Sequence, residues 1–281
     1  MSDAPHEVIP QVVLVGSGQA AWAMGLAMEA ASIRIVQVWA RHPGRGQALA
    51  QALGSRFCPL NTGGVSEEQA PVPWCPEAGK ATLLFLAVSD SSLEEVAARF
   101  QETPHGHVVH CSGNKGLDGL KPHPSRGLFW PLYNLSQPAE EGLQGAPVVV
   151  DASTPELHQI LHRLGQVLGV RTLLLPETER RKLHLAAVMT ANFNNVLLHW
   201  GHRLLGPNAD HAVLYPILRQ QLDHFVQNNR DPLLYQSGPA WRKDLLTLQN
   251  HLDLLAEDPE GTALYRTFSH LIARLRDQSN P

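Results

Sequence analysis

The chain has 281 residues, of which 43% are hydrophobic and 17% are charged, and its formal net charge is −4. This composition lacks the basic surplus that is typical of proteins that bind nucleic acid or an anionic membrane. The longest apolar run, Ala81–Val88, is too short to span a bilayer. We therefore expect neither nucleic-acid nor membrane partners.

The amino terminus, MSDAPHEVIP, has no basic segment followed by an apolar one, so we expect no secretory signal. Cys58, Cys75 and Cys111 form no C-x-x-C pair, and such an odd, sparse set favours a reducing compartment. We expect a cytoplasmic protein. Two histidine clusters are weak evidence for a metal: a strand would put His107 and His110 on opposite faces, and no glutamate lies between His158 and His162, so no metal is expected.

A strand, a glycine turn and a helix open the chain. Gln11–Val15 is a largely apolar run typical of a buried strand, and a helical stretch reaches about Ala31. Between them lie Gly16, Ser17, Gly18, Gln19, Ala20 and Ala21, in the pattern G-x-G-x-x-A. The first glycine permits a tight turn, the second lets the backbone approach a pyrophosphate, and the small last residue allows close helix–strand packing. We expect Gly16–Ala21 to bind a dinucleotide; the alternative is a glycine turn of another α/β protein.

The second predicted strand, Ile33–Arg41, bears on which dinucleotide binds. A site for NAD places Asp or Glu near the end of this strand, but no acidic residue occurs between Glu29 and Glu67. Arg41 and Arg45 are found there instead, and a guanidinium suits the 2′-phosphate of NADP. We therefore expect NADP as the cofactor; the alternative is that both arginines are solvated loop charges.

Strands and helices continue to alternate. Further strands are predicted at Ala81–Val88, His107–Gly113, Arg126–Ser136, Ala146–Ser153 and Val170–Glu177. Ser91 or Ser92 with Glu94 or Glu95 forms a capping-box pattern, and Thr154 followed by Pro155 predicts another helix start. In a doubly wound sheet the carboxyl ends of the strands hold the cofactor. The residues predicted to contact it there are Val88, Ser89, Asp90, Cys111 and Ser112.

After Pro176 only helical periodicity remains. Helices are predicted at about Thr178–Leu205, Ala212–Asn228, Pro239–Leu255 and Gly261–Arg276. The predicted fold is α/β, with an N-terminal Rossmann-type doubly wound sheet (residues 1–176) followed by an all-α C-terminal domain (residues 177–281). The long first helix is apolar nearly all round, so we expect a homodimer through the helical domain.

This first helix also carries an unusual set of polar residues. At 100° per residue His184 and Asn195 share one face, with Asn192 at its edge and Asn194 elsewhere. If this face meets the cofactor, His184 could donate a proton while Asn192 and Asn195 hold a substrate oxygen or the nicotinamide carboxamide. These three are the candidate catalytic residues; the alternative is a polar stripe that fixes helix register.

Several stretches resemble one family. They read LAVSD, VVHCSG, WPLYNLS, ERRKLHLAAVMTANFNN, QSGPAWRKD and NHLDLLAEDP. The chain resembles the Rossmann-like family whose helical C-terminal half is domain of unknown function 2520, which is similar to 6-phosphogluconate dehydrogenase and pyrroline-5-carboxylate reductase. The resemblance implies an N-terminal NADP-binding domain, a dimerising helical domain that meets the substrate, and oxidoreductase activity.

Substrate contacts are expected from residues in two of these stretches, namely Trp130, Tyr133, Ser237, Arg242 and Asp244. Ser237 is expected to cap a helix that begins near Pro239, whose first amides would face an anion. The leading hypothesis is an NADP-dependent oxidoreductase that transfers hydride between the nicotinamide and a small carbonyl, imine or hydroxy substrate in a cleft between the domains. The alternative is a non-catalytic NADP-binding sensor or regulatory dimer.

Overall fold

The computed structural model describes residues 9–60, 82–100, 106–135 and 143–279. The chain divides into two compact units, residues 1–189 and 190–281. The change from sheet to helix comes earlier, where α5 begins at Glu177. Cys75 and His105 lie outside the described residues.

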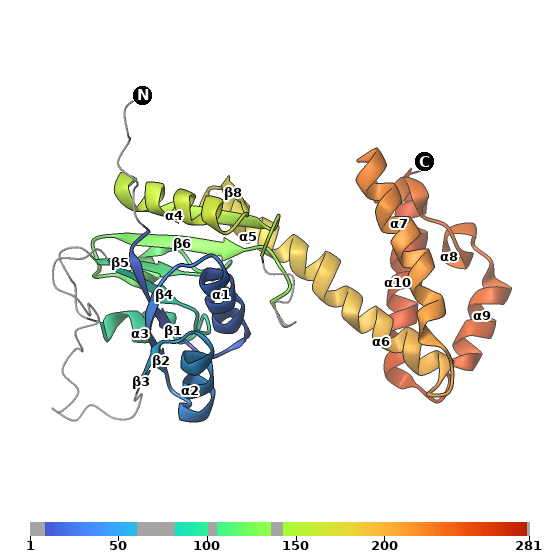
Figure 1. Ribbon diagram of the computed structural model, residues 1–281. Helices are drawn as coiled ribbons and strands as arrows, with labels where there is room; N and C mark the ends of the chain where they lie inside the picture. The colour runs from blue at the N-terminus through green and yellow to red at the C-terminus, as the bar shows by residue number, and fades with distance from the viewer. Residues whose placement is uncertain (1–8, 61–81, 101–105, 136–142, 280–281) are drawn as a thin grey trace. The chain divides into compact units, whose positions relative to one another are not determined.

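The first unit is built on an eight-stranded sheet in the order β3-β2-β1-β4-β5-β6-β7-β8 (Figure 1). The strands β1 to β6 run parallel, β7 pairs antiparallel with β6, and β8 pairs parallel with β7. They are β1 (Gln11–Val15), β2 (Ile35–Ala40), β3 (Arg56–Pro59), β4 (Thr82–Leu86), β5 (Gly106–His110), β6 (Arg126–Pro131), β7 (Pro147–Ala152) and β8 (Arg171–Leu174). The predicted α/β class with a Rossmann-type sheet is confirmed.

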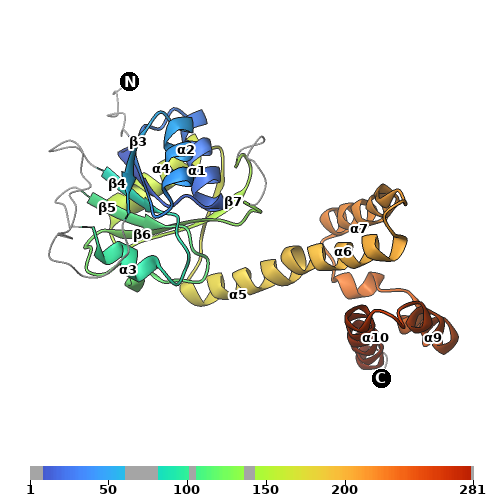
Figure 2. The ribbon, with the colours of Figure 1, turned by 90° about the horizontal axis from the view of Figure 1, so that it is seen from below.

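Helices cover both faces of this sheet because successive side chains of a strand point to opposite faces. On one face, Val12 and Leu14 of β1 belong to the same core as the buried residues of α1 (Gln19–Ala30), α2 (Pro43–Ala52) and α4 (Pro155–Val167). On the other face, Val13 and Val15 share a core with α3 (Leu93–Ala98) and the 3₁₀ turn η1 (Leu117–Leu120). Figure 2 shows α1, α2 and α4 on the side of the sheet opposite α3. Because β1 to β6 run parallel, their carboxyl ends lie at one edge of the sheet, and the loops of the predicted site follow those ends.

The expected continuous helix Thr178–Leu205 is not what the structure contains. The π-helical turn η2 (Val188–Asn192) separates α5 (Glu177–Ala187) from α6 (Phe193–Leu205). Each hydrogen bond of a π turn spans one residue more than in an α-helix, so side chains within η2 do not follow the α-helical spacing of about 100° per residue. The spacing that puts His184 and Asn195 on one face therefore does not carry across η2.

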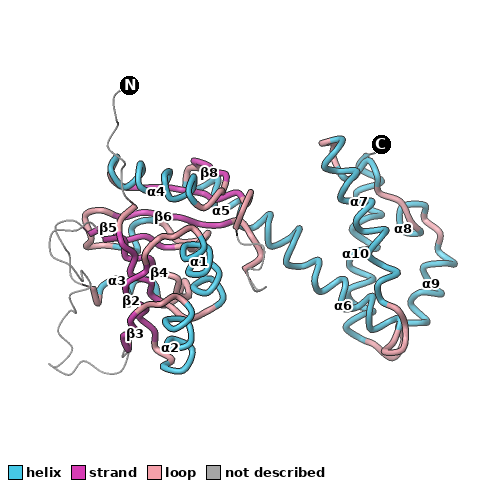
Figure 3. Tube along the Cα trace, viewed as in Figure 1, coloured by secondary structure: helices cyan, strands magenta, loops and turns pink. Residues whose placement is uncertain are grey.

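In its described residues the second unit consists of helices joined by loops and contains no strand (Figure 3). After α6 come η3 (His211–Leu214), α7 (Tyr215–Asn228), η4 (Pro232–Tyr235), α8 (Pro239–Arg242), α9 (Leu245–Leu254) and α10 (Pro259–Ser279). The start of α10 is tied to α6 through Asp258. Its Oδ2 accepts from Trp200 Nε1 at 3.2 Å and lies 3.4 Å from Arg203 Nη2, while its Oδ1 accepts from the Gly261 amide at 2.9 Å.

Few side chains of this second unit are buried. Among residues 190–279 only Ala240, Leu255 and Gly261 are buried, whereas Val226 and Leu254 are 84% and 80% exposed. Leucine and valine side chains are normally among the most buried in a folded domain. A single copy of this unit therefore presents an extensive apolar surface to solvent. No described helix is both long enough and apolar enough to cross a bilayer.

Candidate functional site

The glycine turn after β1 has the geometry that its sequence pattern predicts. Gly16 has φ of +127°, and an added Cβ would lie 2.1 Å from the carbonyl oxygen of Ala87, so only glycine fits between β1 and β4. The same Cβ position lies 3.5 Å from Cβ of Ala21, which is buried, so the small residue allows α1 to pack closely. At Gly18, by contrast, no atom lies within 4 Å of an added Cβ. The backbone at Gly18 is therefore open to a ligand.

The amino terminus of α1 is suited to an anion. Gly18 is its N-cap and provides no side-chain cap, and no acidic residue occupies the first turn. The first amides of a helix have no acceptor within the helix, and the helix dipole adds partial positive charge at that end. Ser17 and Ala20 are half-buried beside this turn and Gln19 is exposed. Residues 16–21 can thus receive a pyrophosphate on backbone N–H groups.

Arg41 lies immediately after β2, and its side chain is hydrogen-bonded to Ser92, which the sequence predicted as a possible helix cap. Its Nη2 donates to Ser92 Oγ at 3.3 Å. Ser92 was expected to share a capping box with a glutamate, but as N-cap of α3 its side chain makes no capping hydrogen bond. Arg45, the other predicted phosphate ligand, is exposed and lies in the first turn of α2, a helix that the sequence did not predict.

The predicted contacts at the ends of β4 and β5 lie at the carboxyl edge of the sheet. Val88 and Asp90 are half-buried and Ser89 is exposed. Cys111 Sγ donates to the Leu86 carbonyl at 3.7 Å, and burial raises the pKa of this thiol to about 12, so it stays protonated at neutral pH. Ser112 Oγ accepts hydrogen bonds from the amides of Asn114 and Lys115 at 3.2 and 3.1 Å, which shapes the loop after β5.

Two buried polar groups, Arg180 and His110, lie next to this loop, and sequence reasoning missed Arg180. Arg180 of α5 is 1% exposed and donates from Nη1 to the Gly113 carbonyl at 2.8 Å. His110 at the end of β5 is fully buried, and its Nδ1 accepts from the Ser112 amide at 3.1 Å. Burial, reinforced by the positive charge of Arg180 and partly opposed by Asp90, lowers the pKa of His110 to about 4. His110 is therefore neutral at physiological pH.

The same loop meets His184 and Trp130. Their ring centroids lie 5.6 Å apart, and an added Cβ on Gly113 would lie 2.5 Å from Trp130 and 2.8 Å from His184. Gly113 thus lets α5 and β6 close on the loop. His184 is half-buried, Trp130 is 8% exposed and Tyr133 is 50% exposed. The structure therefore brings His184, one of the three candidate catalytic residues, to the loop that follows β5.

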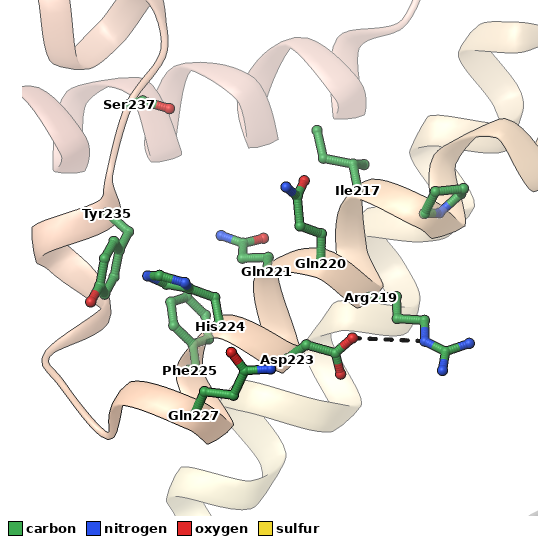
Figure 4. Close-up of a pocket in the computed structure, with 11 residues that line it drawn as sticks. Ile217, Arg219, Gln220, Gln221, Asp223, His224, Phe225, Gln227, Tyr235 and Ser237 are labelled. Atoms are coloured by element: carbon green, nitrogen blue, oxygen red, sulfur yellow. Dashed lines mark ion pairs between the residues drawn. The ribbon is translucent and has the colours of Figure 1, made fainter.

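The other predicted site residues lie in the second unit or at its beginning. Asn192 ends η2 and Asn195 lies in α6, and both are exposed. Ser237 lines a groove of about 690 Å³ along α7 and η4, in which the His224 ring meets Tyr235 edge-on at 4.2 Å (Figure 4). Arg242 ends α8 and is exposed.

The prediction of one helix from Pro239 to Leu255, capped by Ser237, is wrong, because the structure has two helices there, α8 and α9. Gly238 is the N-cap of the short α8 and gives it no side-chain cap, and the left-handed φ of 58° at Lys243 ends α8. Asp244 then caps α9 by accepting from the Thr247 amide at 3.1 Å and from its hydroxyl at 2.7 Å. Both carboxylate oxygens of Asp244 are thereby engaged within the chain, and these bonds lower its pKa. Among the described residues no group of three His, Cys, Asp or Glu side chains converges as metal ligands.

Comparisons with known proteins agree with this architecture. Residues 146–272 match the family model described as Domain of unknown function (DUF2520). A crystal structure from Bacteroides fragilis, described as a "putative NADP oxidoreductase", is 28% identical with a TM-score of 0.80, over 94% of this chain and 98% of that one. A search of curated proteins returns no match.

Two more distant structures share the fold. Protein TM1727 of Thermotoga maritima is 18% identical with a TM-score of 0.61, over 96% of this chain and 100% of that one. A reductive aminase of Aspergillus terreus, solved with NADPH and ethyl-5-oxohexanoate, is 11% identical with a TM-score of 0.60, over 96% of this chain and 95% of that one. The chain thus has a Rossmann-type sheet like that of these structures, and its residues 146–272 match DUF2520.

Proposed function

We propose that this protein is an NADP-dependent oxidoreductase that transfers a hydride between the nicotinamide and a small carbonyl, imine or hydroxy compound. The observation that carries the proposal is the turn from Gly16 to Ala21, where the backbone at Gly18 is open and the first amides of α1 have no cap. The description of the Bacteroides fragilis protein as an NADP oxidoreductase supports the same activity.

In this proposal the chain's own residues divide the work of binding. The amides after Gly18 hold the pyrophosphate, and Arg41 holds the 2′-phosphate. The ends of β4 and β5, with Val88, Ser89, Asp90, Cys111 and Ser112, contact the rest of the dinucleotide. NADPH, when bound, supplies the hydride.

The protein must add orientation and a proton to this chemistry. When a carbonyl is reduced, the hydride forms a C–H bond at the carbonyl carbon while a proton goes to the oxygen. His184 is the proposed donor of that proton, because an imidazole is a common general acid and this one lies against Gly113 and Trp130 at the edge where the nicotinamide is proposed to bind. For Asn192 and Asn195 we keep the role proposed from the sequence, contact with the substrate oxygen or the nicotinamide carboxamide; it rests on their exposed amides and not on a helix face shared with His184.

Binding can be measured without knowing the substrate. We expect NADPH to raise the Tm of the protein and to change the fluorescence of the bound nicotinamide. Arg41→Ala should weaken NADPH far more than NADH, and Arg45→Ala, at the other predicted phosphate ligand, is measured in the same way. Absence of NADPH binding at high micromolar concentration would refute the proposal, and an equal loss for both dinucleotides would refute the preference for NADP.

Turnover separates the enzyme from a protein that only binds the cofactor. A panel of small aldehydes, ketones, cyclic imines and hydroxy acids, followed by NADPH absorbance, should contain at least one substrate. His184→Ala should then lower kcat while leaving NADPH affinity nearly unchanged. Tight NADPH binding without turnover of any compound in the panel would favour the non-catalytic alternative.

We also propose that the protein is a homodimer through its helical unit. The support is the sparse burial in residues 190–279, where large apolar side chains such as Val226 and Leu254 are mostly exposed. Exposed apolar surface of this extent is typical of an interface. Light scattering coupled to size-exclusion chromatography should give the mass of two chains; a mass of one chain at all concentrations would contradict it.

A further inference from the structure

The side chain of Arg41 is connected to the far side of β1. Arg41 follows β2, and Ser92 lies in the turn after β4, while β2 and β4 pair with opposite sides of β1. The hydrogen bond of 3.3 Å from Arg41 Nη2 to Ser92 Oγ therefore passes over the end of the strand that leads into the glycine turn. The exposed side chain of Arg41 is thus hydrogen-bonded to a buried residue, which restricts the conformations that it can adopt.

Ser92 is a fixed partner for that arginine. It is 8% exposed, and its amide donates to the Ser89 carbonyl at 2.9 Å. Its hydroxyl accepts a second hydrogen bond, from Ser89 Oγ at 3.0 Å. A serine at a helix N-cap usually accepts from an amide of the first turn, but this hydroxyl makes no such bond. The hydroxyl serves as an acceptor for Arg41 and Ser89 instead.

We propose that Ser92 is a positioning residue that sets the preference for a 2′-phosphorylated dinucleotide by holding Arg41 in place; this rests on the proposed function. A guanidinium has five N–H donors, and Ser92 occupies one on Nη2, so an edge of the fork stays available for phosphate oxygens. An arginine that is already ordered loses less side-chain freedom when a ligand arrives. NADH carries a 2′-hydroxyl in place of the phosphate, so ordering the Arg41 side chain should increase its affinity only slightly.

The test compares Ser92→Ala with Ser91→Ala by calorimetric titration with NADPH and NADH. Ser91 is the matched control, because it is exposed and its hydroxyl contacts Ser89 Oγ at 3.2 Å but makes no bond to Arg41. We expect Ser92→Ala to weaken NADPH roughly three- to tenfold and NADH less than about twofold, as for loss of one hydrogen bond to an exposed charged group. Ser92→Thr, which keeps the hydroxyl, should restore most of the NADPH affinity.

A double variant shows whether Ser92 acts through Arg41. In the Arg41→Ala background, Ser92→Ala should bring no further loss of NADPH affinity. Titration with 2′,5′-ADP against 5′-AMP should place the whole effect at the 2′-phosphate. Equal losses for NADPH and NADH, no loss in either, or an undiminished loss in the Arg41→Ala background would each overturn the inference alone. Wild-type protein that binds neither dinucleotide would overturn the proposed function as well.

Discussion

Gly16 and Gly18 lie two residues apart, and the structure predicts opposite consequences for adding a methyl group to each. In Gly16→Ala the new Cβ would lie 2.1 Å from the Ala87 carbonyl oxygen and 2.9 Å from its carbon, at a φ of +127°. These neighbours are backbone, and the Ala87 amide also donates to the Val15 carbonyl at 2.8 Å, so the sheet cannot yield without losing hydrogen bonds. Backbone strain of about 1–3 kcal/mol and overpacking of about 1–3 kcal/mol together predict a loss of roughly 2–6 kcal/mol.

For a unit of this size that loss corresponds to a fall in Tm of roughly 5–20 °C. Gly18→Ala is the matched variant, because its φ of −81° suits alanine and no atom lies within 4 Å of the added Cβ. Its Tm should match the wild type, while its NADPH affinity should fall about tenfold or more, since the methyl group stands where the pyrophosphate approaches. Thermal unfolding and calorimetric titration of both variants test this contrast. Equal melting of wild type and Gly16→Ala, or unchanged NADPH affinity in Gly18→Ala, would refute the reasoning.

Three further variants test two buried polar groups, His110 and Arg180, and the partly exposed Asp258. The pKa of His110 is lowered to about 4, below the usual 6.5, so stability is full above pH 6.5 and declines as the pH falls towards 4. Urea unfolding at pH 7.5 and pH 5 should differ by about 2 kcal/mol, and His110→Gln should lose that difference. Arg180→Met leaves the buried Gly113 carbonyl without its donor and should cost about 1–3 kcal/mol, with exposed Arg181→Met as control; equal melting of the two would contradict the role of Arg180. The bond from the Gly261 amide and the charge of Arg203 lower the pKa of Asp258, so its carboxylate stabilises the start of α10 above about pH 4, and this contribution is lost as the pH falls further. Asp258→Asn should weaken the dependence of the unfolding free energy on pH below about pH 4. An unchanged dependence would contradict this role of Asp258.

Much of the first unit could be predicted because its central strands, such as β1 and β4, are buried on both faces and therefore read as continuous apolar runs. The glycine turn and the Thr154 cap could be predicted for a similar reason, since their chemistry is local to a few residues. The reversal of β7 could not, because strand direction depends on pairing with a partner that is distant in sequence. α2 was missed because Pro43–Ala52 holds glycines, alanines and glutamines with little apolar periodicity.

Within the candidate site, local patterns failed where tertiary contacts compete for the same side chain. Ser92 fits a capping box, yet its hydroxyl is used by Arg41 and Ser89. Ser237 fits a helix cap, yet Asp244 caps the longer helix, because the left-handed residue before it ends α8. Arg180 lies one turn before His184, so the same helical spacing could have identified it as a neighbour of the loop after β5.

The sparse burial of residues 190–279 also determines how this unit should respond to denaturant. The dependence of unfolding free energy on urea concentration scales with the surface that unfolding newly exposes. A lone chain whose large apolar side chains already face solvent exposes little more, so its helical signal would decline gradually with urea. If a second copy covers that surface, the same residues unfold steeply, at a midpoint that rises with protein concentration. The slope of unfolding free energy against urea concentration therefore reports how much apolar surface of this unit a second copy buries.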